Sequence, residues 1–315
     1  MITIKKLESV TELVSDFSSV NPFQTPWYFD TFIKHFCDTS SPILLGIYTD
    51  ERSIGYGAFE KVENKILFLG MKPVVNNQEI TDYGDIFLND AGKTHHKEVW
   101  NTLRKWFLDN GYDHLQLDYI REDSQTYELF KEYAVEQLKA PYIFLPKHWD
   151  DYLMVLDRVD RKELKRKMKR LETVSHTYAN INNPAQKDFE EFIRLHKLSS
   201  HQKQDFMTDQ MKHFFWSLVT AEKKDWKTNL CFLQIEEKNT SAILSFENGS
   251  SVLVYNSGYD PSFNYYSVGL LLHAFKIQEA ITKGKTTYDF MRGTERYKYD
   301  LGGKDMRLYR IEISL

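Results

Sequence analysis

The densest group of reactive side chains in this sequence lies within ten residues near its C-terminal end. Asp289, Arg292, Glu295, Tyr297 and Lys298 stand at the end of a short apolar run that is typical of a strand. Carboxylates can move protons, cations can hold an anion, and α/β folds place ligands at the carboxyl ends of their strands. The same charges can instead pair with one another as a structural cluster, and composition alone leaves both interpretations open.

A helix start just before this cluster offers a second kind of chemistry. A strand ends with Tyr255-Asn256, a loop follows, and Ser267 and Gly269 stand where the next helix begins. A serine N-cap and a glycine in the first turn leave backbone N–H groups uncovered. Together with the helix dipole, these donors suit a pyrophosphate. Most such serines only cap their helix, so this signal is weak by itself.

The elements that carry these residues occur in the same order twice. Strand, turn, strand, turn, strand, helix, glycine and strand are predicted over residues 43–118 and again over 230–291. Hairpin strands followed by a helix that crosses to another strand are α/β units with mixed sheets. At roughly 150 residues per domain, a chain of 315 residues suggests two domains. We expect them at residues 1–148 and 149–315.

The most polar segment lies just after the expected boundary. Residues 161–170 contain seven basic side chains and one acid, and Leu164, Met168 and Leu171 share one face of a helix. This pattern predicts an amphipathic helix. Its basic face is either simply solvated or binds an anionic partner, which would be a phosphate-bearing ligand, an anionic membrane surface or RNA.

Several function classes are excluded or disfavoured. The 41 Lys and Arg against 45 Asp and Glu give a net charge of −4, so no global basic field points to DNA. Cys37 and Cys231 lie far apart, and His95-His96 has no third ligand nearby, so we expect no metal site. No apolar run approaches the ~20 residues of a membrane span, and no signal peptide is recognisable. We therefore predict a cytoplasmic protein.

Three motifs resemble the C-terminal signature of the CelD-like acetyltransferase family, part of the GNAT superfamily and related to the Fem-type (FemAB-like) aminoacyl transferases. They are the segments Tyr-Asn-Ser-Gly-Tyr-Asp at 255–260, Ser-x-Gly-Leu-x-Leu at 267–272, and Asp-Phe-x-Arg-Gly-x-Glu-x-Tyr-Lys at 289–298. The resemblance covers roughly residues 150–300. It implies two tandem GNAT-like domains, and acyl transfer from a thioester or an aminoacyl ester to an amine.

The resemblance also implies a donor site in the second domain. Ser267, Gly269 and Leu270 would supply the N–H groups for a pyrophosphate, and Tyr255 and Asn256 the strand edge for a pantetheine chain. The loop before Leu270 lacks the leading Arg or Gln and the second small residue of the usual coenzyme A loop. Two alternatives therefore stay open: a Fem-type transferase that uses aminoacyl-tRNA, and a non-catalytic binding protein on the same fold.

The catalytic and acceptor residues are candidates only. Glu295 and His196 are the candidate general bases, and Tyr297 the candidate acid for a leaving thiolate. The remaining candidates are substrate-binding residues, namely Asp289, Arg292 and Lys298 in the second domain and Asp82 and Tyr83 in the acceptor-side first domain.

We expect an N-acyltransferase that uses acetyl-CoA or another acyl-CoA and no metal. Its acceptor would be an amine, such as an amino sugar of a cell-envelope or polysaccharide precursor. Peripheral membrane contact would go through the basic helix at 161–170.

Overall fold

A computed structural model describes residues 1–13, 21–37 and 42–315, and divides the chain into two compact units. Unit 1 comprises Met1–Leu138 and Met306–Leu315, and unit 2 comprises Lys139–Asp305. These bounds differ from the division at residue 148 because the last strand of the chain pairs with a strand of unit 1, through Leu308 and Arg121 among others. Unit 2 is thus a continuous segment inserted into unit 1.

Unit 1 holds a mixed sheet in the order β1-β2-β3-β4-β6-β13, with β5 paired to β3. Its strands are β1 (Ile2–Leu7), β2 (Ile43–Thr49), β3 (Arg52–Val62), β4 (Lys65–Phe68), β5 (Phe87–Leu88), β6 (His114–Arg121) and β13 (Lys304–Ser314). Its main helices are α1 (Pro26–Phe36), α2 (Asp90–Thr94), α3 (His96–Asp109) and α4 (Gln125–Phe130). Among the strand pairs of this unit that the structure describes, only β4 and β6 run parallel, and α3 lies between them in the chain.

Unit 2 holds a second mixed sheet, in the order β7-β12-β11-β10-β9-β8. Its strands are β7 (Ala134–Phe144, which begins in unit 1), β8 (His176–Asn182), β9 (Lys227–Ile235), β10 (Lys238–Glu247), β11 (Ser251–Tyr259) and β12 (Thr287–Asp289). Its helices are α5 (Trp149–Val155), α6 (Arg158–Leu171), α7 (Gln186–Leu198), α8 (His201–Phe206), α9 (Asp209–Thr220), α10 (Val268–Thr282) and α11 (Arg296–Asp300).

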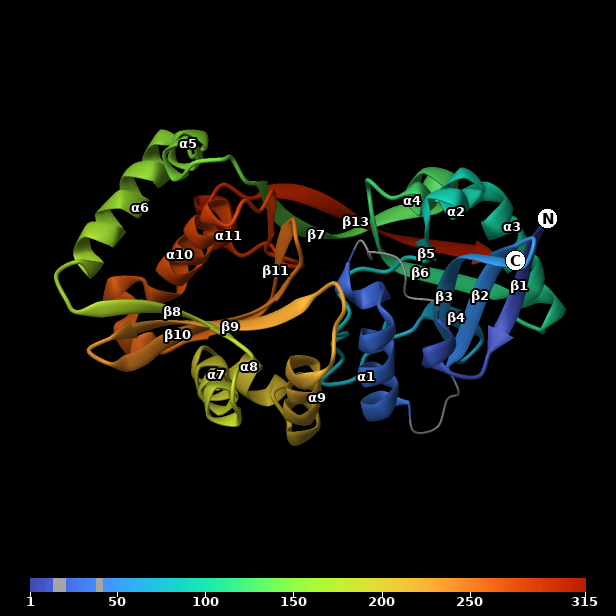
Figure 1. Cartoon of the computed structure of the whole chain (residues 1–315), viewed down its shortest axis with the longest axis horizontal. Helices are drawn as coiled ribbons and strands as arrows, with labels where there is room; N and C mark the ends of the chain where they lie inside the picture. The colour runs from blue at the N-terminus through green and yellow to red at the C-terminus, as the bar shows by residue number, and fades with distance from the viewer. Residues whose placement is uncertain (14–20, 38–41) are drawn as a thin grey trace. The chain divides into compact units, whose positions relative to one another are not determined.

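Helices cover both faces of the unit 2 sheet. Helices α5, α6, α10 and α11 lie on one side, and α7, α8 and α9 on the other (Figure 1). Alternate residues of β9 serve the two faces: Cys231 and Leu233 belong to the core under α10, whereas Leu230 and Phe232 are buried outside that cluster. Apolar side chains on both faces are expected of a strand covered twice.

The two units share one local plan. In unit 2, as in unit 1, an antiparallel run of three strands leads through a helix to a strand that is parallel to the third. The mixed α/β architecture and the repeated order of elements predicted from the sequence are therefore confirmed.

Candidate active site

Strands β11 and β12 separate beyond a short parallel contact. They pair only from Ser251 to Leu253, opposite 287–289, and no strand in the described part of the chain pairs with 254–259 on that side. On the other side, the register with β10 shifts so that Tyr255 is an extra residue between Val254 and Asn256. Such a bulge bends its strand. The result is a strand edge that diverges from its neighbour.

Helix α7 packs directly on this diverging edge. A Cβ atom at Gly258 would lie 2.4 Å from the Cα of His196, so only glycine allows the contact. His196 is 1% exposed and its Nδ1 has no hydrogen-bond partner. Burial lowers the pKa of His196 to about 3, with Lys203 acting in the same direction and Asn256 opposing it. The imidazole is therefore neutral at neutral pH.

Lys203 reaches the same strand from α8. Its Nζ donates a hydrogen bond of 2.5 Å to the carbonyl oxygen of Ser257, while the Ser199 hydroxyl accepts one of 3.0 Å from the amide of Tyr259. Burial lowers the pKa of Lys203 to about 8, although the carboxylate of Glu295 acts against this. The ammonium group of Lys203 therefore lies beside β11, within the electrostatic reach of Glu295.

Tyr297, in α11, completes the group next to β11. Its ring centroid lies 4.9 Å from that of His273 and 6.1 Å from that of Phe290. Burial raises the pKa of Tyr297 well above its usual value and Glu295 adds to this, whereas a hydrogen bond with Ser257 opposes it. The phenol therefore keeps its proton at neutral pH and lies close to the strand.

Lys298 organises the loop after β12. Its side chain is 3% exposed, and Nζ donates to the carbonyl oxygens of Met291, Arg292 and Gly293 at 3.0, 2.8 and 3.0 Å. It also pairs with the half-exposed Glu295 at 2.9 Å. The amide of Met291 donates to Asp289 at 2.7 Å. Asp289 and Lys298 therefore shape this loop, and binding of a substrate by them stays a prediction.

The N-terminus of α10 follows β11 in the chain and leaves its first amides without a side-chain cap. Ser267 has a left-handed backbone (φ 54°) and its hydroxyl makes no capping hydrogen bond. The first helical hydrogen bond runs from the Leu271 amide to the Ser267 carbonyl, 3.0 Å. The amides of Val268, Gly269 and Leu270 precede it, so they have no partner within the helix. This is the arrangement expected for the anion cradle.

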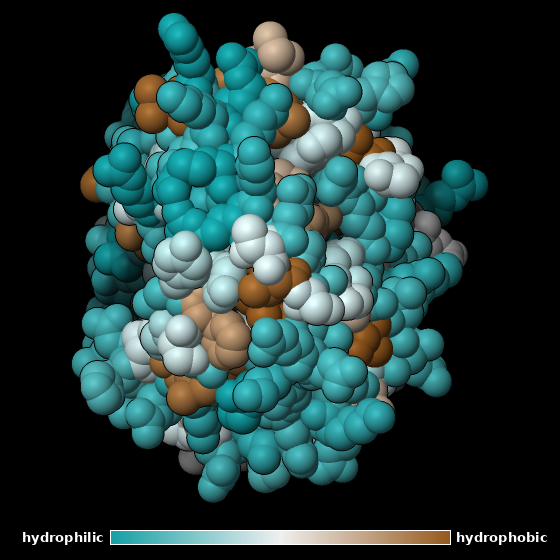
Figure 2. All heavy atoms as spheres, turned by 90° about the vertical axis from the view of Figure 1, so that its left-hand side faces the viewer, coloured by the Kyte–Doolittle hydropathy of each residue, from teal (hydrophilic) through white to brown (hydrophobic). Residues whose placement is uncertain are grey.

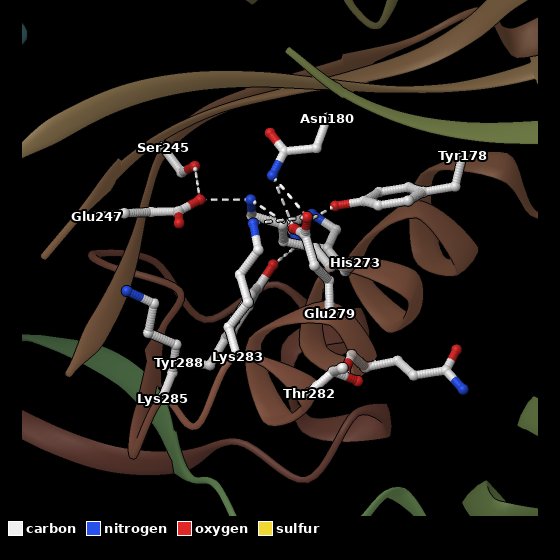
Figure 3. A network of polar contacts seen from close by, with 12 residues as sticks. Tyr178, Asn180, Ser245, Glu247, His273, Glu279, Thr282, Lys283, Lys285 and Tyr288 are labelled. Atoms are coloured by element: carbon white, nitrogen blue, oxygen red, sulfur yellow. Dashed lines mark hydrogen bonds and ion pairs between the residues drawn. The ribbon is translucent and has the colours of Figure 1, made fainter. Parts of the chain in front are cut away.

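A buried network of charges fixes α10 against the sheet (Figure 3). Lys276, whose side chain is 1% exposed, pairs with Glu247 of β10 and with Glu279 at 3.0 Å. Glu279 also accepts hydrogen bonds from Tyr178 and Asn180 of β8, at 2.8 and 2.7 Å. These contacts join α10 to β10 and to β8, and so fix the direction of the helix axis relative to the sheet.

The basic helix α6, predicted over 161–170, lies beside the start of α10 (Figure 1). The guanidinium of Arg170 donates to the Tyr265 carbonyl at 2.6 Å and stands 4.7 Å from the Tyr265 ring. A groove of about 760 Å³ runs between α6, Leu270 and α11. Its cationic lining residues are Arg158, Lys162, Arg166, Lys167 and Arg296.

The groove is not uniformly basic. Asp160, Glu163 and Asp300 also line it. Hydrogen bonds from Arg166 and Lys167 lower the pKa of Glu163 to about 2, which shows that these two cations are already engaged. Arg158 and Lys162 have no ion-pair partner among the residues described. Figure 2 shows that the side of the molecule carrying α6 is mainly hydrophilic in its upper part.

The predicted residues fall into four places. Asn256, His196 and Tyr297 lie along β11, whereas Ser267, Gly269 and Leu270 lie at the start of α10. Tyr255 is at the bulge of β11, and Arg292 and Glu295 lie in the loop held by Lys298. Asp82 and Tyr83 belong to unit 1, where both are buried, and Tyr83 lines a cavity.

Sequence analysis missed Lys203, and it included Ser257 and Gly258 only as members of the 255–260 motif, without a role in the site. An isolated glycine within a strand indicates a close backbone approach, so Gly258 could have been noticed. Lys203 stands in a polar segment without any motif, and only the packing of α8 on β11 reveals it. In the described ranges, no three His, Cys, Asp or Glu side chains are grouped to hold a metal. No helix there has the length and apolar character needed to cross a membrane.

A protein-family model matches most of the second unit. Residues 158–299 match the family model for an acetyltransferase (GNAT) domain. A search of curated protein sequences found no match.

Solved structures with the same fold cover nearly the whole chain. FemX superposes with a TM-score of 0.65 at 11% identity, over 97% of this chain and 94% of that one. The C-terminal domain of a putative lysylphosphatidylglycerol synthetase from Agrobacterium fabrum gives 0.57 at 8%, over 90% of both chains. A tandem GNAT protein from the clavulanic acid biosynthesis pathway gives 0.53 at 8%, over 100% and 98%. At these identities the likeness concerns the fold, which is that of tandem GNAT proteins.

Proposed function

We propose that the protein transfers an acyl group from acyl-CoA to an amine, because residues 158–299 match the family model for an acetyltransferase (GNAT) domain and the fold is that of tandem GNAT proteins. One observation carries the proposal: β11 leaves β12 at Leu253, bends at Tyr255, and leads into the uncapped N-terminus of α10. A pantetheine chain would lie along the free strand edge, and its pyrophosphate would meet the α10 amides.

The residues beside β11 suit the two proton transfers of this reaction. The amine attacks the thioester carbonyl, a C–N bond forms, and the C–S bond breaks. The exposed carboxylate of Glu295 is the first candidate to accept the proton lost by the amine, directly or through one water, and the phenol of Tyr297 would give a proton to the departing thiolate. The buried imidazole of His196 is the second candidate base, because its lowered pKa makes it a weaker proton acceptor.

For the acceptor we propose an amino sugar of a cell-envelope or polysaccharide precursor, modified in the cytoplasm. This choice rests on the family resemblance. Asp289, Arg292 and Lys298 would border the acceptor through the loop after β12.

Calorimetric titration with acetyl-CoA tests the donor site. The wild-type protein should bind with micromolar affinity, and Ser267→Glu, which adds a carboxylate at the proposed cradle, should abolish binding. Thr282→Glu is the matched control because it adds the same charge at the exposed C-terminal end of α10. Failure of the wild type to bind acetyl-CoA and longer acyl-CoAs would overturn the donor assignment. If Ser267→Glu and Thr282→Glu weaken acetyl-CoA binding equally, the donor site does not lie at the N-terminus of α10.

A second donor is favoured by the groove between α6 and α10. Arg158 and Lys162 line it without an ion-pair partner among the described residues, and a tRNA acceptor arm is rich in phosphates. The similar synthetase is named for lysylphosphatidylglycerol, an aminoacylated lipid. An aminoacyl ester in place of the thioester would need the same two proton transfers.

Binding of fluorescent aminoacyl-tRNA at several salt concentrations tests this alternative. If tRNA binds in the groove, the double variant Arg158→Glu with Lys162→Glu should weaken binding. The slope of log K against log salt should also become shallower by roughly 2, because two phosphate contacts are lost. Lys187→Glu, on the exposed face of α7, is the control. Binding that is unchanged by the double variant would exclude this groove as the tRNA site.

A further inference from the structure

Unit 1 contains a cavity that takes no part in the donor site proposed above. It has a volume of about 320 Å³ and lies between the segment at 83–88, helices α2 and α3, and the turn that leads into α4. This volume is at the lower end of those that hold small molecules. Its polar lining includes Asn21, Gln24, Asp85 and His96.

Asp85 is held firmly by hydrogen bonds to one of its two carboxylate oxygens. Oδ1 accepts a hydrogen bond of 2.8 Å from the Ile86 amide and one of 2.6 Å from the Thr126 hydroxyl. A hydroxyl has one proton to donate. Thr126 must therefore accept from its other neighbours, which are Trp100 Nε1 at 3.2 Å and His96 Nε2 at 3.2 Å. This chain of contacts fixes the carboxylate and assigns the His96 proton to Nε2.

The other charged groups around the cavity are already paired. Arg121 binds Asp123 through two hydrogen bonds of 2.9 and 2.8 Å, and Lys93 pairs with Asp90 at 3.1 Å. Asp85 forms no ion pair with any residue in the described part of the chain. The Asp85 carboxylate therefore lines the cavity without a cationic partner among the described residues of unit 1.

The titration of Asp85 agrees with this geometry. Burial raises its pKa to about 7, the nearby Asp123 acts in the same direction, and Thr126, Ile86 and Ser124 oppose it by hydrogen bonding. Burial also lowers the pKa of His96 to about 4, so this imidazole is neutral and supplies no positive charge. A cation entering the cavity would favour the ionised carboxylate.

We propose that this cavity binds the ammonium group of a small polyhydroxylated amine, an amino sugar, with Asp85 as its counter-ion. Asn21 and Gln24 line the same space with side-chain amides that can bind sugar hydroxyls. The choice of an amino sugar rests on the acceptor proposed above, whereas the ammonium site rests only on the cavity and its unpaired carboxylate.

Calorimetry with glucosamine and glucose tests the site in the full-length protein. Glucosamine should bind saturably and glucose, which lacks the amine, at least tenfold more weakly. Asp85→Asn should weaken glucosamine binding at least tenfold without affecting glucose. Asp109→Asn removes an exposed carboxylate of the same unit that does not line the cavity, and should change neither. Absence of glucosamine binding, equal binding of the two sugars, or an unaffected Asp85→Asn variant would each overturn the proposal.

A measurement on the wild type removes dependence on a folded variant. At pH 6.5 Asp85 is mostly protonated, and pairing with an ammonium should expel most of that proton. Titrations of glucosamine in two buffers of different ionisation enthalpy should show this release, and heats that are independent of the buffer would contradict the proposal. Because acetyl-CoA binding is measured separately, failure at this site is distinguishable from failure at the donor site.

Discussion

Replacement of Lys276 by methionine should destabilise unit 2 strongly. Lys276 and its partner Glu247 have side chains that are only 1% and 6% exposed, so neither charge can return to water without unfolding. In Lys276→Met, the Glu247 carboxylate would keep a contact to the Ser245 hydroxyl at 3.4 Å but would lose its cation. An unpaired buried charge is the costly state, more so than the loss of the pair itself.

The expected loss follows from this burial. Removing one partner of a buried pair costs about 3–5 kcal/mol. A unit of this size loses about 2–4 °C of melting temperature per kcal/mol, so the transition of unit 2 should fall by about 10 °C. The double variant Lys276→Met with Glu247→Leu should recover most of this loss, because Glu279 keeps Lys283 at 2.8 Å and its hydrogen bonds from β8.

Differential scanning calorimetry of the four proteins in this double-mutant cycle measures the coupling. We expect a large loss for Lys276→Met, a smaller one for Glu247→Leu because Lys276 keeps Glu279 at 3.0 Å, and a partial recovery in the double variant relative to Lys276→Met. A loss of less than about 1 kcal/mol in Lys276→Met would refute this expectation. So would a double variant as unstable as Lys276→Met, since that result would locate the cost in packing rather than in the orphaned carboxylate.

Four further outcomes are expected. Tyr297→Phe keeps the ring packing and should lower kcat about 10²-fold, with little change in KM, in steady-state kinetics. An unchanged kcat would exclude proton donation by the phenol. Lys298→Met should release the loop after β12 and abolish activity, and limited proteolysis should detect new cleavage near Gly293. Gly258→Ala should lower both stability and activity because the new Cβ atom would clash with His196. Gly269→Ala, whose Cβ atom would lie 3.4 Å from Tyr259, should fold normally. Equal melting temperatures of these two variants would contradict this expectation. Burial raises the pKa of Glu279, but this is outweighed by Lys276, Lys283, Asn180 and Tyr178, and the pKa falls from 4.5 to about 2. The stability that Glu279 contributes should therefore be complete above about pH 4.5 and be lost towards pH 2. Glu279→Gln should flatten the acid denaturation curve in that range.

Local patterns of the sequence predict most of the elements correctly. The runs at 230–235, 241–246 and 251–256 lie within β9, β10 and β11, and the apolar helix after Ser267 is α10. Alternating burial and helical spacing are local properties, and for this reason they are visible in one sequence. The basic segment also forms the expected helix, with Leu164 and Leu171 buried and Met168 partly so.

Long-range pairing is what the sequence does not reveal. The pairing of Leu308 with Arg121 joins strands that are far apart in the chain, and no residue type marks it. The role of Lys298 is similar, because a lysine that binds three carbonyl oxygens and one that binds a phosphate look alike in sequence. Asp85 is a third example, because nothing in the sequence distinguishes it from the predicted Asp82 three residues earlier. Only the structure shows that Asp85 accepts a hydrogen bond from the Thr126 hydroxyl.

The return of β13 to unit 1 constrains the order in which the chain can fold during synthesis. Unit 2 is a continuous segment, so all of its strands have left the ribosome before Met306 does. Unit 1 must wait with the edge of β6 unpaired until the final strand arrives. An open strand edge invites pairing with other chains. The nascent protein therefore passes through a stage in which all of unit 2 has been synthesised while the β6 edge of unit 1 is still open to aggregation, which is the reverse of the usual order for tandem domains.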